Sequence, residues 1–213
     1  MQKHYFTTSK TARYFTLGNE HAETVWFVCH GYGQLAEYFI KNFEGLDPEK
    51  NFIIAPEALS RFYLEGFSGR VGAAWMTKEE REPEVIDYIN YLNSLYDLLL
   101  KRRSDVKINI LGFSQGVPAV CRWVADGKVK FDKLILWAGI FPPDLNSDFS
   151  FTIENLLKDK LTYIVYGRQD QFLKEEHLVE IEKFKLIKPE LKVLIYEGKH
   201  EINKEILERI SIE

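Results

Sequence analysis

The sequence predicts a single domain of the α/β class, spanning residues 1–213, with a mostly parallel sheet between layers of helices. The length of 213 residues fits one domain better than two. Short apolar runs alternate with longer amphipathic segments, a pattern typical of strands and helices that follow each other in turn. Hydrophobic residues make up 46% of the chain and charged residues 28%, which is the balance of a globular protein with a full core.

The expected sheet has about eight strands. Two N-terminal segments rich in Tyr, Phe and Thr, residues 3–8 and 12–17, are expected to pair as a hairpin. Short apolar runs with β-branched and aromatic residues are typical of buried strands. Such runs lie at residues 25–29, 52–55, 106–111, 133–138, 161–166 and 191–196.

The helices are expected between these strands. The clearest covers residues 83–101, where Pro83 suits the first helical position because its missing N–H needs no partner there. The apolar residues of this segment recur every three or four positions and form one stripe. Residues 56–81 show no clear period and are expected to form a long aromatic loop, which in a compact domain often serves function. Further helices are expected at residues 35–44, 115–126, 174–187 and 202–211.

Composition and charge exclude several classes of protein. The net charge of −4 argues against general nucleic-acid binding, which needs a basic face. The longest apolar runs have about five residues, far fewer than the ~20 of a transmembrane helix, and the N-terminus has no stretch of signal-peptide type. We therefore expect a cytoplasmic protein without stable membrane insertion. Cys29 and Cys121 both lie in apolar contexts and are expected to be buried free thiols.

The strongest local signal is a nucleophile elbow. Residues 112–116 read Gly-Phe-Ser-Gln-Gly and match the pattern G-x-S-x-G. An expected strand precedes them and an expected helix follows, so Ser114 would lie on the tight turn between the two. The glycines keep side chains out of that turn, and Pro118 is tolerated in the first turn of the helix. A tight turn with an idle serine is the alternative.

A serine nucleophile needs a base, normally a histidine oriented by a carboxylate. In this arrangement the chain order is Ser, acid, His. That order excludes His4, His21 and His30, and His30 is expected to be structural. His177 lies in a charged amphipathic helix and is expected on its solvated face. His200 follows the last strand, where α/β sheets place their sites, and is the candidate base.

The candidate acid is Asp170, which follows the strand at 161–166 and so also lies at a strand's carboxyl end. Asp170 is also placed to cap the helix expected at 174–187. Asp144, Asp148 and Asp159 compete for the role, but the first suits a turn and the other two lie in polar stretches.

The tetrahedral intermediate of acyl transfer needs fixed N–H donors for its oxyanion. We expect these to be the backbone N–H groups of Gln115, directly after the nucleophile, and of Tyr32, in the glycine-flanked loop after the strand at 25–29. The Tyr32 side chain is expected to wall an acyl pocket, and Phe113 to contact substrate beside the nucleophile.

Metal and nucleotide sites are not expected. The motifs HExxH, CxxC and GxxxxGK[ST] are absent, and no two His or Cys stand at ligand spacing. Residues 31–36 match the dinucleotide fingerprint G-x-G-x-x-G only in part, because Ala36 takes the last position. We therefore expect no cofactor and no metal.

Four motifs in order resemble the phospholipase/carboxylesterase branch of the α/β-hydrolases, which includes the acyl-protein thioesterases. The resemblance covers residues 25–205 and implies an α/β-hydrolase fold without a cap domain. It also implies a triad of Ser114, Asp170 and His200, with Tyr32 and Gln115 forming the oxyanion hole. The motifs are Cys-His-Gly-Tyr-Gly at 29–33, Leu-Gly-Phe-Ser-Gln-Gly at 111–116, Tyr-Gly-Arg-Gln-Asp at 166–170 and Glu-Gly-Lys-His at 197–200.

Residues 70–76 resemble a stretch of that family that lies near the site and ends in Trp-Phe. Trp75 is therefore a candidate pocket wall, with a buried core tryptophan as the alternative. The sequence departs from the family where Met76 replaces the Phe, at Val117 and Pro118, and over residues 57–70. These departures concern the choice of substrate rather than the class of reaction.

The expected activity is hydrolysis of a carboxylic ester or thioester of a small molecule or acyl chain. One alternative is a non-catalytic relative that binds a ligand or partner, but such a protein has no need of nucleophile, base, acid and oxyanion loop together. Acyl transfer to an acceptor other than water is another alternative, which the sequence does not separate from hydrolysis. The aromatic content of 14% leaves room for a surface on which two copies of the chain form a homodimer.

Overall fold

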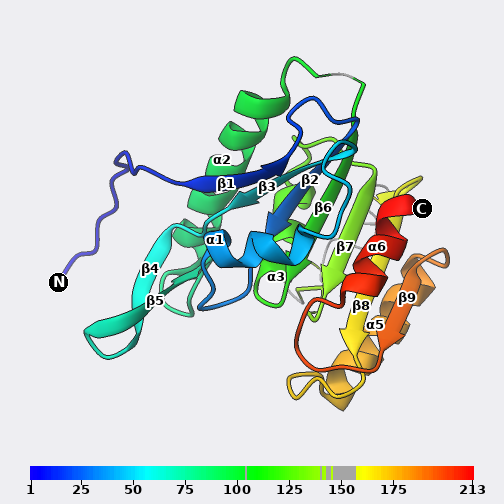
Figure 1. The fold of residues 1–213 in the computed structure, drawn as a ribbon. Coiled ribbons are helices and arrows are strands. Elements are labelled where there is room, and N and C mark those ends of the chain that lie inside the picture. The colour runs from blue at the N-terminus through cyan, green and yellow to red at the C-terminus, as the bar shows by residue number, and fades with distance from the viewer. Residues whose placement is uncertain (104, 140, 143–144, 146–156) are drawn as a thin grey trace.

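The computed structural model describes residues 1–103, 105–139, 141–142, 145 and 157–213 (Figure 1). Seven of the described strands form one sheet in the order β1-β3-β2-β6-β7-β8-β9, in which β1 runs antiparallel to β3 and the other neighbours are parallel. This agrees with the mostly parallel sheet predicted from the sequence. The strands are β1 (Tyr14–Gly18), β2 (Thr24–Cys29), β3 (Asn51–Pro56), β6 (Lys107–Phe113), β7 (Lys133–Trp137), β8 (Leu161–Gly167) and β9 (Lys192–Tyr196).

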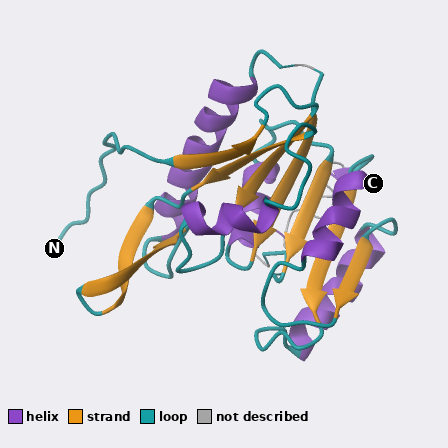
Figure 2. Ribbon diagram, in the orientation of Figure 1, coloured by secondary structure: helices purple, strands orange, loops and turns teal. Residues whose placement is uncertain are grey.

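Helices cover both faces of the sheet (Figure 2). Side chains of β2 alternate between the two layers: Val25, Phe27 and Cys29 pack on one side, and Trp26 and Val28 on the other. The first layer contains α2 (Arg81–Leu100), α3 (Gly116–Ala125) and α5 (Glu175–Ile187). The second contains α1 (Ala36–Phe39), the 3-10 helix η1 (Ile40–Phe43) and α6 (Lys204–Ile212). Each helix overlaps one of the predicted segments.

The predicted N-terminal hairpin is wrong. Residues 3–8 form no strand, and β1 instead pairs with β3 from Tyr14–Pro56 to Gly18–Phe52. The aromatic and Thr content gave β1 its strand character, but the partner was set by the open edge of β3, where Phe15 and Leu17 pack on the core. Lys3 and Tyr5 both bond to the Glu80 carboxylate, next to the start of α2.

The predicted loop at 56–81 contains a second small sheet. Strands β4 (Ser60–Glu65) and β5 (Ser68–Ala74) pair as an antiparallel hairpin that projects from the main body (Figure 1). Most of its side chains are at least partly exposed, so no buried face produces a clear hydrophobic alternation in the sequence.

Both cysteines are buried thiols outside any disulfide, as predicted, and burial raises the pKa of Cys29. Within the described ranges, no helix is long and apolar enough to cross a lipid bilayer.

The parallel strands β2, β6, β8 and β9 end at one edge of the sheet, and their following loops meet there. Ligand sites of α/β sheets lie at this edge. The loops that carry the predicted site residues follow Cys29, Phe113, Gly167 and Tyr196.

Candidate active site

The turn between β6 and α3 holds Ser114 in a strained backbone conformation. Its φ angle is 52°, in the left-handed region that side-chain-bearing residues seldom adopt. The Ser114 N–H donates to the Trp137 carbonyl at 2.8 Å, which ties the turn to the end of β7. Such a conformation costs about 1–3 kcal/mol and persists only where the surroundings enforce it. The sequence prediction of a tight turn at Ser114 agrees with this geometry.

Two glycines make this turn sterically feasible. A Cβ added to Gly112 would lie 2.4 Å from the carbonyl oxygen of Gly116, so the end of the strand and the start of the helix touch directly. A Cβ on Gly116 would lie 2.2 Å from the carbonyl oxygen of Cys29, at the end of β2. The second contact brings the loop after β2 against the serine turn, as an oxyanion hole built from both loops requires.

His200 and Asp170 form a hydrogen-bonded pair. His200 Nδ1 lies 2.7 Å from Asp170 Oδ2, and the Asp170 side chain is only 2% exposed. The other oxygen, Oδ1, accepts the N–H of Phe172 at 2.9 Å. The His200 ring also contacts the rings of Phe113 and Phe172, at centroid distances of 4.9 and 4.7 Å. The imidazole is therefore held in one orientation by a carboxylate and two aromatic rings.

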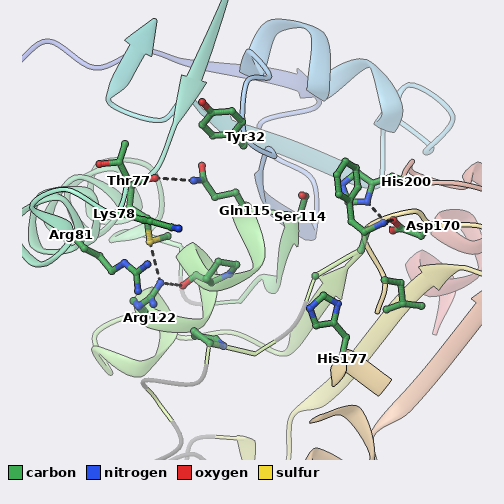
Figure 3. Close-up of a pocket in the computed structure, with 17 residues that line it drawn as sticks. Tyr32, Thr77, Lys78, Arg81, Ser114, Gln115, Arg122, Asp170, His177 and His200 are labelled. Carbon is green, nitrogen blue, oxygen red and sulfur yellow. Dashed lines mark hydrogen bonds and ion pairs between the residues drawn. The ribbon is translucent and has the colours of Figure 1, made fainter. Parts of the chain in front are cut away.

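Ser114, His200 and Asp170 lie at one cavity (Figure 3). Because Asp170 occupies Nδ1, Nε2 is the nitrogen left to receive a proton. The described contacts include no hydrogen bond between the Ser114 hydroxyl and His200. Catalytic hydrogen bonds are often long in ligand-free proteins and tighten when substrate binds.

The competing acids do not reach this site within the described residues. Asp159 lies two residues before β8, at the amino end of the strand and so at the opposite edge of the sheet. Asp144 and Asp148 lie outside the described residues. Asp170 does not cap α5, because Lys174 holds the N-cap position.

The loop after β2 presents the second predicted oxyanion donor. Within the described part of the chain, the backbone N–H groups of Tyr32 and Gln115 have no hydrogen-bond partner, and both residues line the cavity. Buried His30 fixes the adjoining peptide group. Its Nδ1 lies 2.8 Å from the Gly31 oxygen, while its Nε2 accepts the N–H of Ala58 at 3.1 Å.

These two contacts require neutral His30 with the proton on Nδ1. Burial lowers the pKa of His30, which favours the same neutral form. The Gly31 oxygen and the Tyr32 N–H belong to one planar peptide group, so His30 orients the donor without touching a substrate. This agrees with the structural role expected for His30.

The cavity has a volume of about 640 Å³, within the range of small-molecule sites. Tyr32 lines it, but Trp75 and Phe113 do not. Trp75 is 2% exposed, and its Nε1–H donates to the His30 carbonyl oxygen at 2.8 Å, so it is a buried core residue. Phe113 is also buried and lies against His200. The expectation that Trp75 and Phe113 contact substrate is thus not supported by their positions.

His177 and three cationic side chains line the same cavity. His177 was expected on a solvated helix face, but its side chain is 24% exposed and its Nδ1 accepts the Lys174 N–H. Lys78, Arg81 and Arg122 lie across from the His200–Asp170 pair, with Ser114 between (Figure 3). Sequence reasoning missed these three. Arg122 had a usable signal, because it follows Pro118 by four residues on α3 and so shares its face.

Metal binding has no support among the residues that the structure describes, because they contain no group of three or more His, Cys, Asp or Glu side chains suited to hold an ion.

Comparison with solved structures assigns the α/β-hydrolase fold. Zea mays acyl-protein thioesterase 2 is 16% identical with a TM-score of 0.70, over 94% of this chain and 96% of the other. Esterase PE8 is 18% identical with a TM-score of 0.67, over 95% and 97%. A phospholipase/carboxylesterase from Dyadobacter fermentans is 15% identical with a TM-score of 0.65, over 97% and 99%.

The amino-acid sequence matches no family profile and no curated protein. At identities this low the structural likeness concerns the fold, and it confirms the fold class predicted from the motifs. The chain has the α/β-hydrolase fold, and the resemblance to the phospholipase/carboxylesterase branch holds at that level.

Proposed function

We propose that the protein is a serine hydrolase that cleaves carboxylic esters or thioesters through an acyl-enzyme. The observation that carries this proposal is the hydrogen-bonded Asp170–His200 pair beside Ser114 on a left-handed turn. Backbone strain and a fixed imidazole cost stability, and such features cluster at catalytic sites. Similar structures named as a thioesterase, an esterase and a phospholipase/carboxylesterase give further support.

The acylation step follows from these positions. Ser114 Oγ attacks the carbonyl carbon and forms a C–O bond, while His200 Nε2 takes the hydroxyl proton. The intermediate's oxyanion accepts hydrogen bonds from the Tyr32 and Gln115 N–H groups. When the intermediate collapses, the bond from carbon to the leaving oxygen or sulfur breaks, and His200 returns the proton to that atom. Asp170 holds the imidazole tautomer and stabilises the imidazolium.

Deacylation repeats these steps with water. His200 Nε2 takes a proton from a water molecule, whose oxygen attacks the acyl carbon of the Ser114 ester. The second intermediate collapses with cleavage of the bond to Ser114 Oγ, which regains its proton from His200. The products are a carboxylic acid and the alcohol or thiol. No step requires a metal or an organic cofactor.

The test is active-site labelling with a fluorophosphonate, followed by intact mass. We expect one adduct per chain, on the peptide that contains Ser114. The adduct should be lost in Ser114→Ala and His200→Ala, and kept in Ser211→Ala, which removes a partly exposed hydroxyl in α6. An unlabelled wild-type protein, under conditions where a known serine esterase reacts fully, would contradict the proposal and favour a binding role. Product analysis with added alcohol or amine acceptors separates hydrolysis from acyl transfer.

Other predictions from the sequence complete the proposal. We place the enzyme in the cytoplasm, with a small-molecule ester or thioester as its substrate and no nucleic-acid partner. The whole chain is proposed to be one domain. The homodimer is tested by the mass of the protein in solution.

A further inference from the structure

The cavity wall that faces the candidate triad is cationic, although the whole chain has a net charge of −4. Lys78, Arg81 and Arg122 line it. Among the described lining residues the single carboxylate is Asp170, whose side chain is 2% exposed and bonded to His200. The positive charge of this wall is therefore local and opposes the charge of the protein as a whole.

Arg122 has a fixed position in this wall. The residue is 7% exposed, and its Nη1 donates to the Pro118 carbonyl oxygen and to Met76 Sδ, both at 3.3 Å. The guanidinium is thus turned back along α3 to the level of Pro118. Pro118 lies in the first turn of α3, which begins two residues after Ser114. The guanidinium and the candidate nucleophile therefore line the same cavity.

Lys78 and Arg81 are exposed, and neither forms an ion pair with another described residue. None of the glutamates of this segment, Glu79, Glu80, Glu82 and Glu84, lines the cavity. Glu80 bonds to Lys3 and Tyr5. Glu84 accepts the Thr77 N–H at 2.6 Å and the Ser60 hydroxyl at 3.3 Å. Lys78 and Arg81 are thus the charged side chains that this segment presents to the cavity.

We propose that the substrate of this site carries an anionic group, a carboxylate or a phosphate, a few bonds from the scissile carbonyl. This inference rests on the proposed function. Lys78 and Arg81 bind the anion through charge-assisted hydrogen bonds, which are stronger than those between neutral groups. The substrate's uncharged spacer crosses the apolar part of the cavity, which contains Met76, Pro118, Pro142, Phe172 and Leu173. A purely hydrocarbon chain gains nothing from the two exposed cations, and it would strip water from them.

The test compares matched esters that differ only in charge. 4-Nitrophenyl hydrogen adipate and 4-nitrophenyl methyl adipate share the acyl chain, and one ends in a carboxylate. Acetyl esters of 4-hydroxybenzoate and of its methyl ester place the same charge on the alcohol side. Competition by adipate and by monobutyl phosphate distinguishes a carboxylate from a phosphate. The readout is the ratio of kcat/KM for the charged ester to that for its neutral partner.

The variants are chosen outside the catalytic groups. Lys78→Ala combined with Arg81→Ala removes the two exposed cations. Arg81→Glu reverses one charge at the start of α2, and Arg102→Glu makes the same change in net charge just beyond the end of that helix. The two arginines are separated by about 30 Å, so Arg102→Glu controls for the overall charge of the protein.

We expect the wild type to prefer the charged ester of at least one pair by about tenfold. Exposed ion pairs are individually weak, so the double variant should lower this preference roughly fivefold to tenfold, mainly through KM. Arg81→Glu should lower it at least as much, whereas Arg102→Glu should leave it unchanged. Added salt should weaken the preference.

Two results overturn the inference while the proposed function stands. One is efficient cleavage of neutral esters with no preference for the charged partners. The other is a preference that the double variant and Arg81→Glu leave intact. If the protein cleaves none of the esters and gives no fluorophosphonate adduct, the proposed hydrolase function is contradicted. The inference about the anionic substrate then fails with it.

Discussion

The two sides of the cavity are built in different ways. The strand-end side, defined by Ser114, Asp170 and His200, depends on a left-handed turn, close backbone contacts and a hydrogen bond between His200 and a buried carboxylate. The cationic side, defined by Lys78, Arg81 and Arg122, has two exposed side chains and one buried one. Groups that perform chemistry need tightly fixed positions, whereas groups that attract a charge act over several ångströms. We infer that reaction class is set by the first side and substrate choice by the second.

The largest effect is expected at Asp170. Asp170→Asn should lower kcat about 10⁴-fold, because an amide does not stabilise the imidazolium and favours the wrong tautomer of His200. The steady-state rate on a neutral nitrophenyl ester measures this loss, and circular dichroism checks that the fold is kept. Asp159→Asn, at the opposite edge of the sheet, is the matched control and should behave like the wild type. A variant at Asp170 that keeps a tenth of the rate would mean that the strand-end side does not act as a triad.

A large effect on stability is expected at His30, behind the strand-end side. His30→Ala leaves the Ala58 N–H and one bond of the Gly31 oxygen unsatisfied and creates a cavity. We expect a loss of about 3 kcal/mol in the free energy of unfolding, measured by urea titration. The rate on the neutral ester should fall as well, since the Tyr32 N–H loses its support. An unchanged rate in the folded variant would show that His30 does not position the donor.

The same residue predicts a pH dependence of stability. Burial holds the pKa of His30 below its ordinary value of 6.5, so in acid the unfolded chain binds a proton that the folded chain refuses. The contribution of neutral His30 to stability is complete above pH 6.5 and is lost as pH falls from there toward the folded pKa. His30→Gln keeps a donor and an acceptor but does not titrate. Its stability should fall less steeply than that of the wild type between pH 6.5 and 5, and parallel curves would contradict the assignment.

A smaller effect is expected at Gln115, whose side chain links the two sides. Its Oε1 accepts the Trp75 N–H at 3.0 Å and its Nε2 donates to the Met76 oxygen at 2.8 Å, just before Lys78 in the chain. Gln115→Ala keeps the backbone N–H of the oxyanion hole but releases this segment. We expect a loss of about 1–3 kcal/mol in stability and a few-fold loss of rate on neutral esters. The rate on charged esters should fall further than the rate on neutral esters. Equal losses on both would show that Gln115 does not position the cationic side.

The difference between the two sides also explains which site residues could be predicted from the sequence and which could not. The serine turn is a local feature, because Gly112, Gly116 and the flanking strand and helix are close in the sequence. Asp170 and His200 follow from strand order, which brings the carboxyl ends of parallel strands to one edge. Lys78 and Arg81 lie in the segment without clear periodicity, and nothing local shows that this segment folds against the cavity. Trp75 illustrates the same limit: its stretch lies beside the site, but its ring turns inward to the His30 carbonyl.

The smallest effect concerns the backbone strain at Ser114 on the strand-end side. Ser114→Gly relieves the left-handed conformation, φ 52°, while Ser114→Ala keeps a Cβ and therefore the strain. Part of the relief is offset by the greater freedom of glycine in the unfolded chain, so Ser114→Gly should exceed Ser114→Ala by about 1 kcal/mol in stability. That difference corresponds to roughly 2–4 °C in Tm for a chain of this size. Ser94, in the middle of α2, supplies the control, because there glycine should be less stable than alanine by about 1 kcal/mol. If the glycine variant is more stable than the alanine variant at Ser114 but less stable at Ser94, the fold maintains strain at the nucleophile. If the difference has the same sign at both positions, that argument for a catalytic turn is removed.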